Sequence, residues 1–213
     1  KLPQQLHSLV KKMAQLLSLK RIHFTEAMKT LNEDELKDID ALTVQQKIDF
    51  EGAVLWNATL NYRLSCVKAL KEFYPVIHWD KHWKELLNEG FTLKPPLNYY
   101  KELPLFYNAC KINFNATSLQ MLTAINQRVF DIPACGSFLL TDHQESLEGL
   151  FDIGKEVITY KDKDEIPELA RFYLNNPDLR ERVALAGMKR VTMEHTYKHR
   201  IEKIIGVMKL RYG

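Results

Sequence analysis

The stretch RVFDIPACGSFLLTD, residues 128–142, decides the fold. Its first part continues a helical pattern that opens at Ser118 and ends near Ile132, before a proline. Small residues at 133–136 then predict a turn, and the apolar run 137–141 has the length of a buried strand. A helix that leads through a short turn into a buried strand is typical of βαβ units. The stretch therefore predicts a parallel sheet covered by helices.

Similar short apolar runs occur on both sides of this stretch. We expect strands at 75–79, 91–93, 111–115 and 156–160. Helical patterns cover 104–110, 166–174, 177–192 and 197–210, and Asp80 suits the N-cap of a further helix that ends before Gly90. Strands alternating with helices in this way indicate an α/β fold with a parallel sheet over residues 74–213.

The first part of the chain, residues 1–73, is predicted to be entirely helical. Leucines and other apolar residues between Leu6 and Leu17 recur at three- and four-residue spacing, which marks one face of a helix. A second helix is expected over 26–39, and a third begins at Thr43 in a capping box and continues as far as Phe73. The apolar faces need a partner surface, on this chain or outside it. We therefore expect a linker or interaction segment, with a homodimer through these helices as one outcome.

Composition excludes several classes of protein. The 213 residues are 46% hydrophobic and 27% charged, as in ordinary globular domains, and the formal net charge is only +3. Nearly balanced charge does not favour a nucleic-acid-binding protein. No window is apolar enough for a membrane span, no signal peptide opens the chain, and the three cysteines form no CxxC pair. Reduced thiols in a cytoplasmic protein are the expectation.

Four segments follow the carboxyl ends of the predicted strands, where ligands bind in open parallel sheets. They are residues 79–81, 115–118, 141–143 and 161–164. The segment with Asn115, Thr117 and Ser118 joins a strand to a predicted helix start, where free N–H groups and the helix dipole favour an anion such as phosphate. The alternative is that Thr117 or Ser118 only caps the helix.

A second candidate site surrounds the turn at 133–136. Cys135 and Gly136 are small enough to let a ligand or a neighbouring backbone approach. Arg128 and Asp131 lie three apart on the preceding helix and share a face, so they offer a cation for phosphate and an acceptor for ribose hydroxyls. The alternative is an ordinary ion pair within the helix.

Other chemistry finds little support in the sequence. The chain has no GxGxxG, Walker A, HExxH or nucleophile-elbow motif, and its histidine pairs, 78 with 82 and 195 with 199, do not share a helix face. We therefore expect no metal site. The aromatic stretch around Tyr99, Tyr100 and Tyr107 permits stacking on a base, but core packing is the favoured interpretation.

Four ordered blocks of sequence resemble one family. RVFDIPACGSFLLTD (128–142), FDIGKEVITY (151–160) and EHTYKHR (194–200) resemble the C-terminal half of CgeB-like (spore-maturation-type) bacterial glycosyltransferases, and YNACKINFN (107–115) is similar to the family's strand ending in Asn. These enzymes belong with the group 1 glycosyltransferases of the two-domain GT-B architecture. The match covers residues 74–210.

The resemblance implies a Rossmann-like domain at 74–213 that binds a nucleotide-sugar donor. In such enzymes an acidic residue at the position of Asp131 holds the ribose, and Arg128 with Thr117 and Ser118 would suit the diphosphate. Many relatives carry a second Glu where this chain has Thr123. GT-B enzymes work without a bound metal, because cations and a helix start stabilise the leaving diphosphate.

The resemblance also implies what lies outside the chain. An N-terminal domain normally supplies the acceptor site, and we expect it to be missing here, so that this part alone binds donor without transferring sugar. The competing hypothesis is a non-catalytic interaction scaffold derived from such a domain.

Overall fold

The computed structural model describes residues 2–78, 83–87 and 89–213. The expectations that concern Trp79, Asp80, His82 and the segment 79–81 lie outside the described residues. The chain divides into two compact units, one made of residues 1–69 with 116–124 and the other of 70–115 with 125–213. The first unit thus includes a short segment from within the region 74–213.

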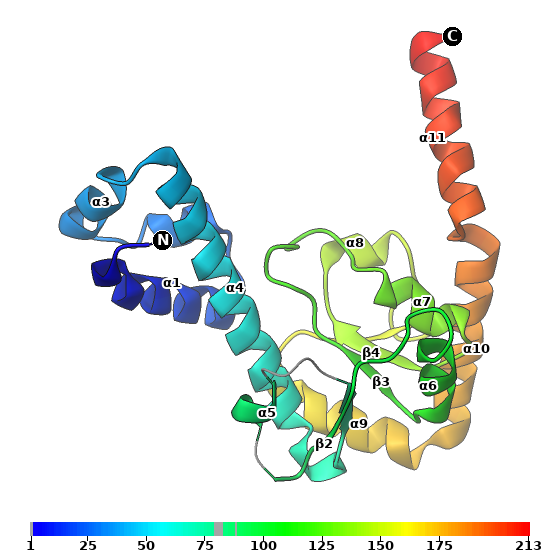
Figure 1. Ribbon diagram of the computed structural model, residues 1–213. Coiled ribbons are helices and arrows are strands. Elements are labelled where there is room, and N and C mark those ends of the chain that lie inside the picture. Colours follow the sequence, from blue (N-terminus) through cyan, green and yellow to red (C-terminus); the bar gives the residue numbers. More distant parts are fainter. Residues whose placement is uncertain (1, 79–82, 88) are drawn as a thin grey trace. The chain divides into compact units, whose positions relative to one another are not determined.

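The first unit is helical, as the sequence predicts. It contains α1 (His7–Lys20), α2 (Phe24–Met28), α3 (Glu33–Asp40) and α4 (Val44–Ala69). The apolar face of α1 packs along α4, burying Met13 and Leu17 of α1 and Phe50 and Val54 of α4 (Figure 1). The partner surface that the first helix requires is therefore supplied by α4 of the same chain.

Two capping boxes set the helix boundaries in this unit. Thr43 and Gln46 exchange hydrogen bonds at the start of α4, which confirms the predicted start. The helix predicted over 26–39 is wrong as one element. Asn32 and Glu35 form a second capping box that begins α3, and this separates α3 from α2.

The helix predicted to start at Ser118 is also wrong. Residues 118–127 form turns, and α7 (Arg128–Ala134) begins ten residues later. Thr59 of α4 accounts for the difference, because its hydroxyl accepts the Leu119 N–H at 3.1 Å and lies 3.2 Å from the Ser118 hydroxyl. These bonds fix the segment to α4, and the side chain of Asn126 accepts the Arg128 N–H instead.

The second unit carries the parallel strands. Strands β3 (Asn113–Asn115), β4 (Leu139–Asp142) and β5 (Ile158–Tyr160) form a parallel sheet in that order. Among the described residues, strands β1 (Val76–His78) and β2 (Thr92–Lys94) pair in parallel with each other and with no other strand. The α/β class with parallel strands is confirmed, but the strands form two sheets rather than one.

Besides α7, the helices of this unit are α5 (Trp83–Leu86), α6 (Leu103–Ala109), α8 (Glu145–Glu148), α9 (Ile166–Asn175), α10 (Pro177–Glu194) and α11 (Tyr197–Tyr212). Helices α6, α7, α8 and α10 close the core on the three-stranded sheet (Figure 1). Their buried side chains form one apolar cluster with the strands: Tyr107, Val129, Ile132, Leu139, Leu147, Phe151, Val157 and Val191. The cluster holds α7 firmly between the sheet and α10.

The turn after α7 depends on glycine. Gly136 has a φ of +70°, a left-handed conformation that side chains rarely adopt, and its N–H bonds to the Pro133 carbonyl. At the crossing of α7 and α10, Gly187 faces the Glu156 carbonyl so closely that a Cβ would lie 2.4 Å from the oxygen. Glycine is thus required for conformation at one position and for close packing at the other.

Candidate functional site

Arg128 and Asp131 lie on the outer face of α7. Val129 and Ile132 point into the core, so residues 128 and 131 face away from it. The Arg128 side chain is exposed and forms no salt bridge with any described residue. Asp131 is half-buried and does not pair with Arg128 among the described residues; its Oδ2 accepts a hydrogen bond from the Tyr99 hydroxyl at 2.5 Å. The alternative of an ordinary ion pair within the helix therefore does not hold in this structure.

The carboxylate dominates the electrostatics of this face. The hydrogen bond that Tyr99 donates to Asp131, the burial of the tyrosine and the negative charge of Asp131 together raise the pKa of Tyr99 to about 12. Burial raises the pKa of Tyr107 to about 12, with Asp131 adding to the shift and Arg128 opposing it. Burial and the same carboxylate also raise the pKa of the Cys135 thiol. The Asp131 carboxylate and the Arg128 guanidinium therefore act on one small region of the protein. A carboxylate can accept hydrogen bonds from hydroxyl groups of a ligand, and a guanidinium can pair with an anion.

Asn115 is buried in a polar network within the protein. Its Nδ2 donates to the Thr141 hydroxyl at 2.9 Å, and its Oδ1 accepts from Asn126 at 3.1 Å. Its carbonyl accepts the Tyr160 hydroxyl at 3.2 Å. The residue joins β3 to β4, β5 and the approach to α7, so its structural role is clear.

Thr117 and Ser118 belong to the helical unit. Thr117 is buried, and Ser118 contacts Thr59 as described above. No helix starts there among the described residues, so the helix N-terminus expected at these two residues is wrong, and their contact with an anion stays a prediction. The structure does not bring them together with Arg128 and Asp131 in one unit.

Cys135 and Gly136 form the predicted turn, but the space beside Gly136 is occupied by the protein. A Cβ at position 136 would lie 3.3 Å from the sulfur of Met188 on α10. Cys135 is half-buried against the apolar cluster. The turn at Gly136 thus lies against a side chain of α10 and not against a neighbouring backbone, and ligand binding at Cys135 and Gly136 stays a prediction.

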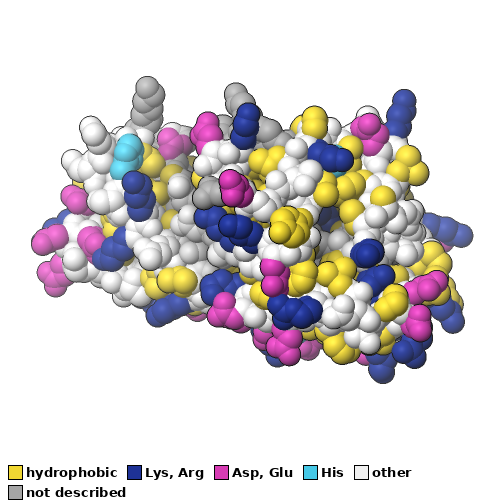
Figure 2. Space-filling model, turned by 90° about the horizontal axis from the view of Figure 1, so that it is seen from below, with side chains coloured by type: hydrophobic (Ala, Val, Ile, Leu, Met, Phe, Trp, Pro, Cys, Tyr) yellow, Lys and Arg dark blue, Asp and Glu magenta, His cyan; other side chains and the backbone are white. Residues whose placement is uncertain are grey.

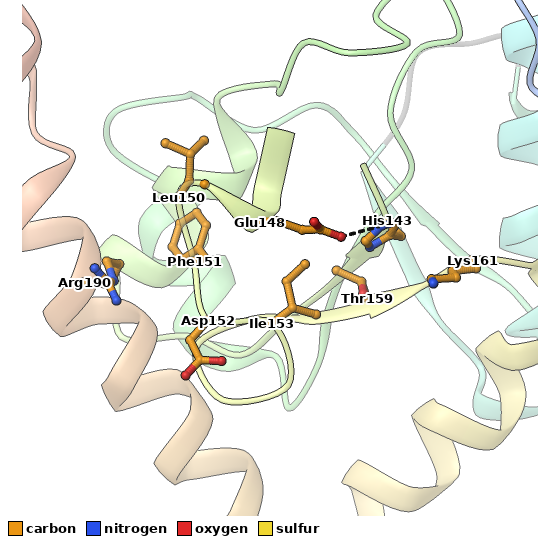
Figure 3. Close-up of a pocket in the computed structure, with 10 residues that line it drawn as sticks. His143, Glu148, Leu150, Phe151, Asp152, Ile153, Thr159, Lys161 and Arg190 are labelled. Carbon is orange, nitrogen blue, oxygen red and sulfur yellow. Dashed lines mark ion pairs between the residues drawn. The ribbon is translucent and has the colours of Figure 1, made fainter. Parts of the chain in front are cut away.

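A cavity of about 650 Å³ opens beyond the carboxyl ends of β4 and β5 (Figure 3). His143 follows β4 directly, Thr159 lies in β5, Lys161 follows β5, and Arg190 comes from α10. The remaining lining residues lie on α8 and the loop after it: Glu148, Gly149, Leu150, Phe151, Asp152 and Ile153. This volume lies within the range of small-molecule sites.

Two polar side chains, His143 and Glu148, lie close together at this cavity. Glu148 and His143 point toward each other in Figure 3, and His143 Nε2 lies 3.4 Å from Glu148 Oε1. Arg190 is held by Glu156 at 2.9 Å and by Glu194 at 2.7 Å, so its charge is already compensated. Sequence reasoning missed the cavity as a site, although the rule on strand ends pointed to the segments 141–143 and 161–164.

The block EHTYKHR has a structural role in this chain. His195 Nε2 donates to the Leu150 carbonyl at 2.8 Å, and its ring lies against Phe130 and Phe151. Arg200 stacks on Phe130 and donates to His195 Nδ1. Together they fix the junction of α10 and α11, at the predicted break near Thr196.

Two further histidines, His78 and His199, form hydrogen bonds within the protein. His199 bonds to Thr196 at the start of α11, and His78 bonds to the Pro95 carbonyl. Within the ranges that the structure describes, no three His, Cys, Asp or Glu side chains are placed to hold a metal ion. Metal independence of any reaction stays a prediction. No helix in the same ranges has the length and hydropathy needed to cross a membrane.

Comparison with known proteins supports the resemblance of the sequence blocks. Residues 58–206, more than half of the chain, match the family described as glycosyl transferase-like. The chain is also similar to the spore protein CgeB of Bacillus subtilis (strain 168), with 31% identity over 113 residues, which is 50% of this chain. The aligned part spans 34% of that protein's length, and no solved structure matches the chain. From the match over residues 58–206, we conclude that this chain belongs to the glycosyl transferase-like family.

Proposed function

We propose that this chain binds a nucleotide-diphosphate sugar as the donor for a sugar transfer. The observation that carries the proposal is the outer face of α7, where Arg128 and Asp131 stand side by side without pairing. A ribose needs an acceptor for its hydroxyl hydrogens, and a diphosphate needs a cation. One face of one helix offers both.

Each of the two residues has a defined role in the proposal. Asp131 accepts hydrogen bonds from the ribose hydroxyls, taking the place of the Tyr99 hydroxyl. The Arg128 guanidinium pairs with the diphosphate and stabilises the charge that develops as the sugar departs. Transfer without a metal, the GT-B architecture and an acceptor domain outside this chain are parts of the same proposal. The chain alone would then bind donor but not transfer sugar.

The cavity beyond β4 and β5 is the competing location for the donor. It has the size of a ligand site and carries Lys161, a cation on a different element from Arg128. The two locations make opposite predictions for variants. Asp131→Asn should weaken donor binding if α7 holds the nucleotide, and Lys161→Ala should weaken it if the cavity does.

Binding of UDP, GDP, ADP, TDP and CMP, with and without magnesium, tests the proposal. A ligand that binds the native state raises the melting temperature, and calorimetry then gives the dissociation constant. We expect one diphosphate to bind without magnesium, and Asp131→Asn to lower its affinity about tenfold, as for the loss of a hydrogen bond to a charged group. Asp38→Asn is the matched control, because that carboxylate is exposed on α3, in the other unit of the chain.

Several outcomes would contradict the proposal. If no nucleotide binds either this chain or the longer protein, the interaction scaffold becomes the better explanation. Equal affinity in wild type and in a folded Asp131→Asn variant would remove Asp131 from the site. A binding step that strictly requires magnesium would overturn metal independence alone.

A further inference from the structure

Tyr107 is a core residue whose one polar side-chain atom has no partner in the described part of the chain. It lies in α6, is only 6% exposed, and belongs to the apolar cluster together with Val129 and Ile132 of α7. Its carbonyl accepts a hydrogen bond from the Asn113 side chain at 3.0 Å, but its hydroxyl forms none with any residue that the structure describes. Core packing therefore accounts for the ring of Tyr107 and not for its hydroxyl.

A buried hydroxyl without a hydrogen bond is costly, so buried tyrosines usually have a partner. Tyr160 in β5 follows this rule, because it is fully buried and donates to the Asn115 carbonyl at 3.2 Å. Tyr173 on α9 is 8% exposed, and its hydroxyl, like that of Tyr107, has no partner among the described residues. The surroundings of each hydroxyl must therefore decide whether it serves a ligand.

The surroundings of Tyr107 and Tyr173 differ in charge. Burial accounts for the raised pKa of Tyr173. At Tyr107, burial raises the pKa to about 12, and two charges of α7 act as well, since Asp131 adds to the shift and Arg128 opposes it. The Tyr107 hydroxyl thus lies within electrostatic reach of both residues on the outer face of α7. It also keeps its proton at neutral pH and can donate it in a hydrogen bond.

We infer that the Tyr107 hydroxyl is a third ligand contact of the site on α7 and donates a hydrogen bond to a phosphate oxygen of the bound nucleoside diphosphate. This inference rests on the proposed function and adds a residue to it. An ionised carboxylate such as Asp131 can only accept hydrogen bonds, so it suits the ribose hydroxyls. An ionised phosphate also only accepts, so it needs donors, and Arg128 and Tyr107 would supply a cation and a neutral donor.

Recognition of the phosphate groups has to depend on individual side chains. On the face seen in Figure 2, acidic and basic side chains are interspersed, and the formal net charge of the whole chain is only +3. Such a charge distribution gives little general attraction for a diphosphate. A hydroxyl held in place by its buried ring would add directed binding beside Arg128 without a further loss of side-chain freedom.

Tyr107→Phe tests the inference, because it keeps the ring in the core and removes only the hydroxyl. Calorimetry would compare the diphosphate that binds best among UDP, GDP, ADP and TDP with its own nucleoside, which has the ribose but no phosphate. We expect Tyr107→Phe to lower the affinity for the diphosphate about tenfold, as for the loss of a hydrogen bond to a charged group, and to change that for the nucleoside little. Asp131→Asn should weaken both ligands, because both carry the ribose.

Tyr173→Phe is the matched control. It makes the same chemical change at another buried tyrosine of the same unit, on which burial and not the charges of α7 acts, and it should leave the affinity for the diphosphate unchanged. Because the Tyr107 hydroxyl has no described partner, Tyr107→Phe should not lower the free energy of unfolding measured without ligand. A clear loss of stability would show that the hydroxyl is bonded within the protein, which would overturn the inference.

The remaining outcomes separate this inference from the proposed function. If Asp131→Asn weakens binding of the diphosphate and Tyr107→Phe does not, the inference is wrong and the proposed function stands. An equal loss for the nucleoside and the diphosphate in Tyr107→Phe would overturn the assignment to a phosphate oxygen. If no diphosphate binds the wild-type chain or the longer protein, both are overturned together.

Discussion

Tyr99 donates a hydrogen bond to Asp131 from a position 32 residues earlier in the chain, with 2.5 Å between the two oxygens. The carboxylate that we propose for a ribose is thus already bound to a hydroxyl of the protein itself. Tyr99 remains 40% exposed and stands beside Tyr100, so it can leave without disturbing the core. In a bound nucleotide, a ribose hydroxyl would replace the Tyr99 hydroxyl as the donor to Asp131.

We predict that Tyr99→Phe increases the affinity for the nucleoside diphosphate about tenfold. The variant removes the hydroxyl that competes for Asp131 and keeps the ring, and a hydrogen bond to a charged group contributes about 1.5–3 kcal/mol at most. Calorimetry with the diphosphate identified in the binding screen measures the change. Tyr100→Phe is the control, because its hydroxyl forms no hydrogen bond with the described residues. A lower affinity in Tyr99→Phe would show that Tyr99 helps to hold the ligand.

Alkaline pH should weaken the fold through two tyrosines. The pKa values of Tyr99 and Tyr107 are raised from 10.0 to about 12, by the bond to Asp131 and by burial respectively. The folded protein therefore keeps protons that the unfolded chain loses near pH 10. The stabilisation is fully present below that pH and is lost as the pH rises through about 12. Urea unfolding at a series of pH values should show this fall, and Tyr99→Phe should make it shallower; an unchanged slope would contradict the role of Tyr99.

Asn115 should matter for stability rather than for ligand affinity. Asn115→Ala removes a buried side chain whose two ends are both bonded, and it leaves the Thr141 hydroxyl and the Asn126 amide short of partners. We expect a loss of about 1–3 kcal/mol in the free energy of unfolding. Asn175→Ala, on an exposed helix end, should change stability by less than about 0.5 kcal/mol. If nucleotide affinity falls sharply while stability stays unchanged, Asn115 belongs to the ligand site after all.

Local patterns predicted the parts of this fold that depend on local chemistry. Apolar runs located β3, β4 and β5, and the Thr43 capping box located the start of α4. The start of α7 was mispredicted because it depends on Thr59, a residue 60 positions away that binds the Leu119 N–H. No pattern within residues 118–132 reveals that bond.

The candidate site could be predicted only in part, for a related reason. Residues 128 and 131 share a helix face by their spacing alone, so their placement follows from the sequence. The bond from Tyr99 to Asp131 depends on how a distant loop returns to α7. The cavity needs β4, β5, the loop after α8 and α10 to be in place together, which no single motif encodes.

The crossing of α7 and α10 depends on the glycine at position 187. Gly187→Ala places a methyl group 2.4 Å from the Glu156 carbonyl oxygen and 3.3 Å from the side chain of Pro133. Because the first neighbour is backbone, α10 must move away from α7 and from the loop that leads to β5. We expect a loss of about 1–3 kcal/mol in the free energy of unfolding.

Gly206→Ala is the matched control, on a helix in the same unit. Nothing lies within 4 Å of the added Cβ in α11, so the substitution should stabilise the helix by about 0.5–1 kcal/mol. Urea unfolding of the two variants measures both changes. If Gly187→Ala has the same stabilising effect as Gly206→Ala, the close contact between α10 and the Glu156 carbonyl does not exist in solution. A loss at position 187 with a gain at position 206 would show that α10 is packed tightly on α7 and that nothing packs against α11 at position 206.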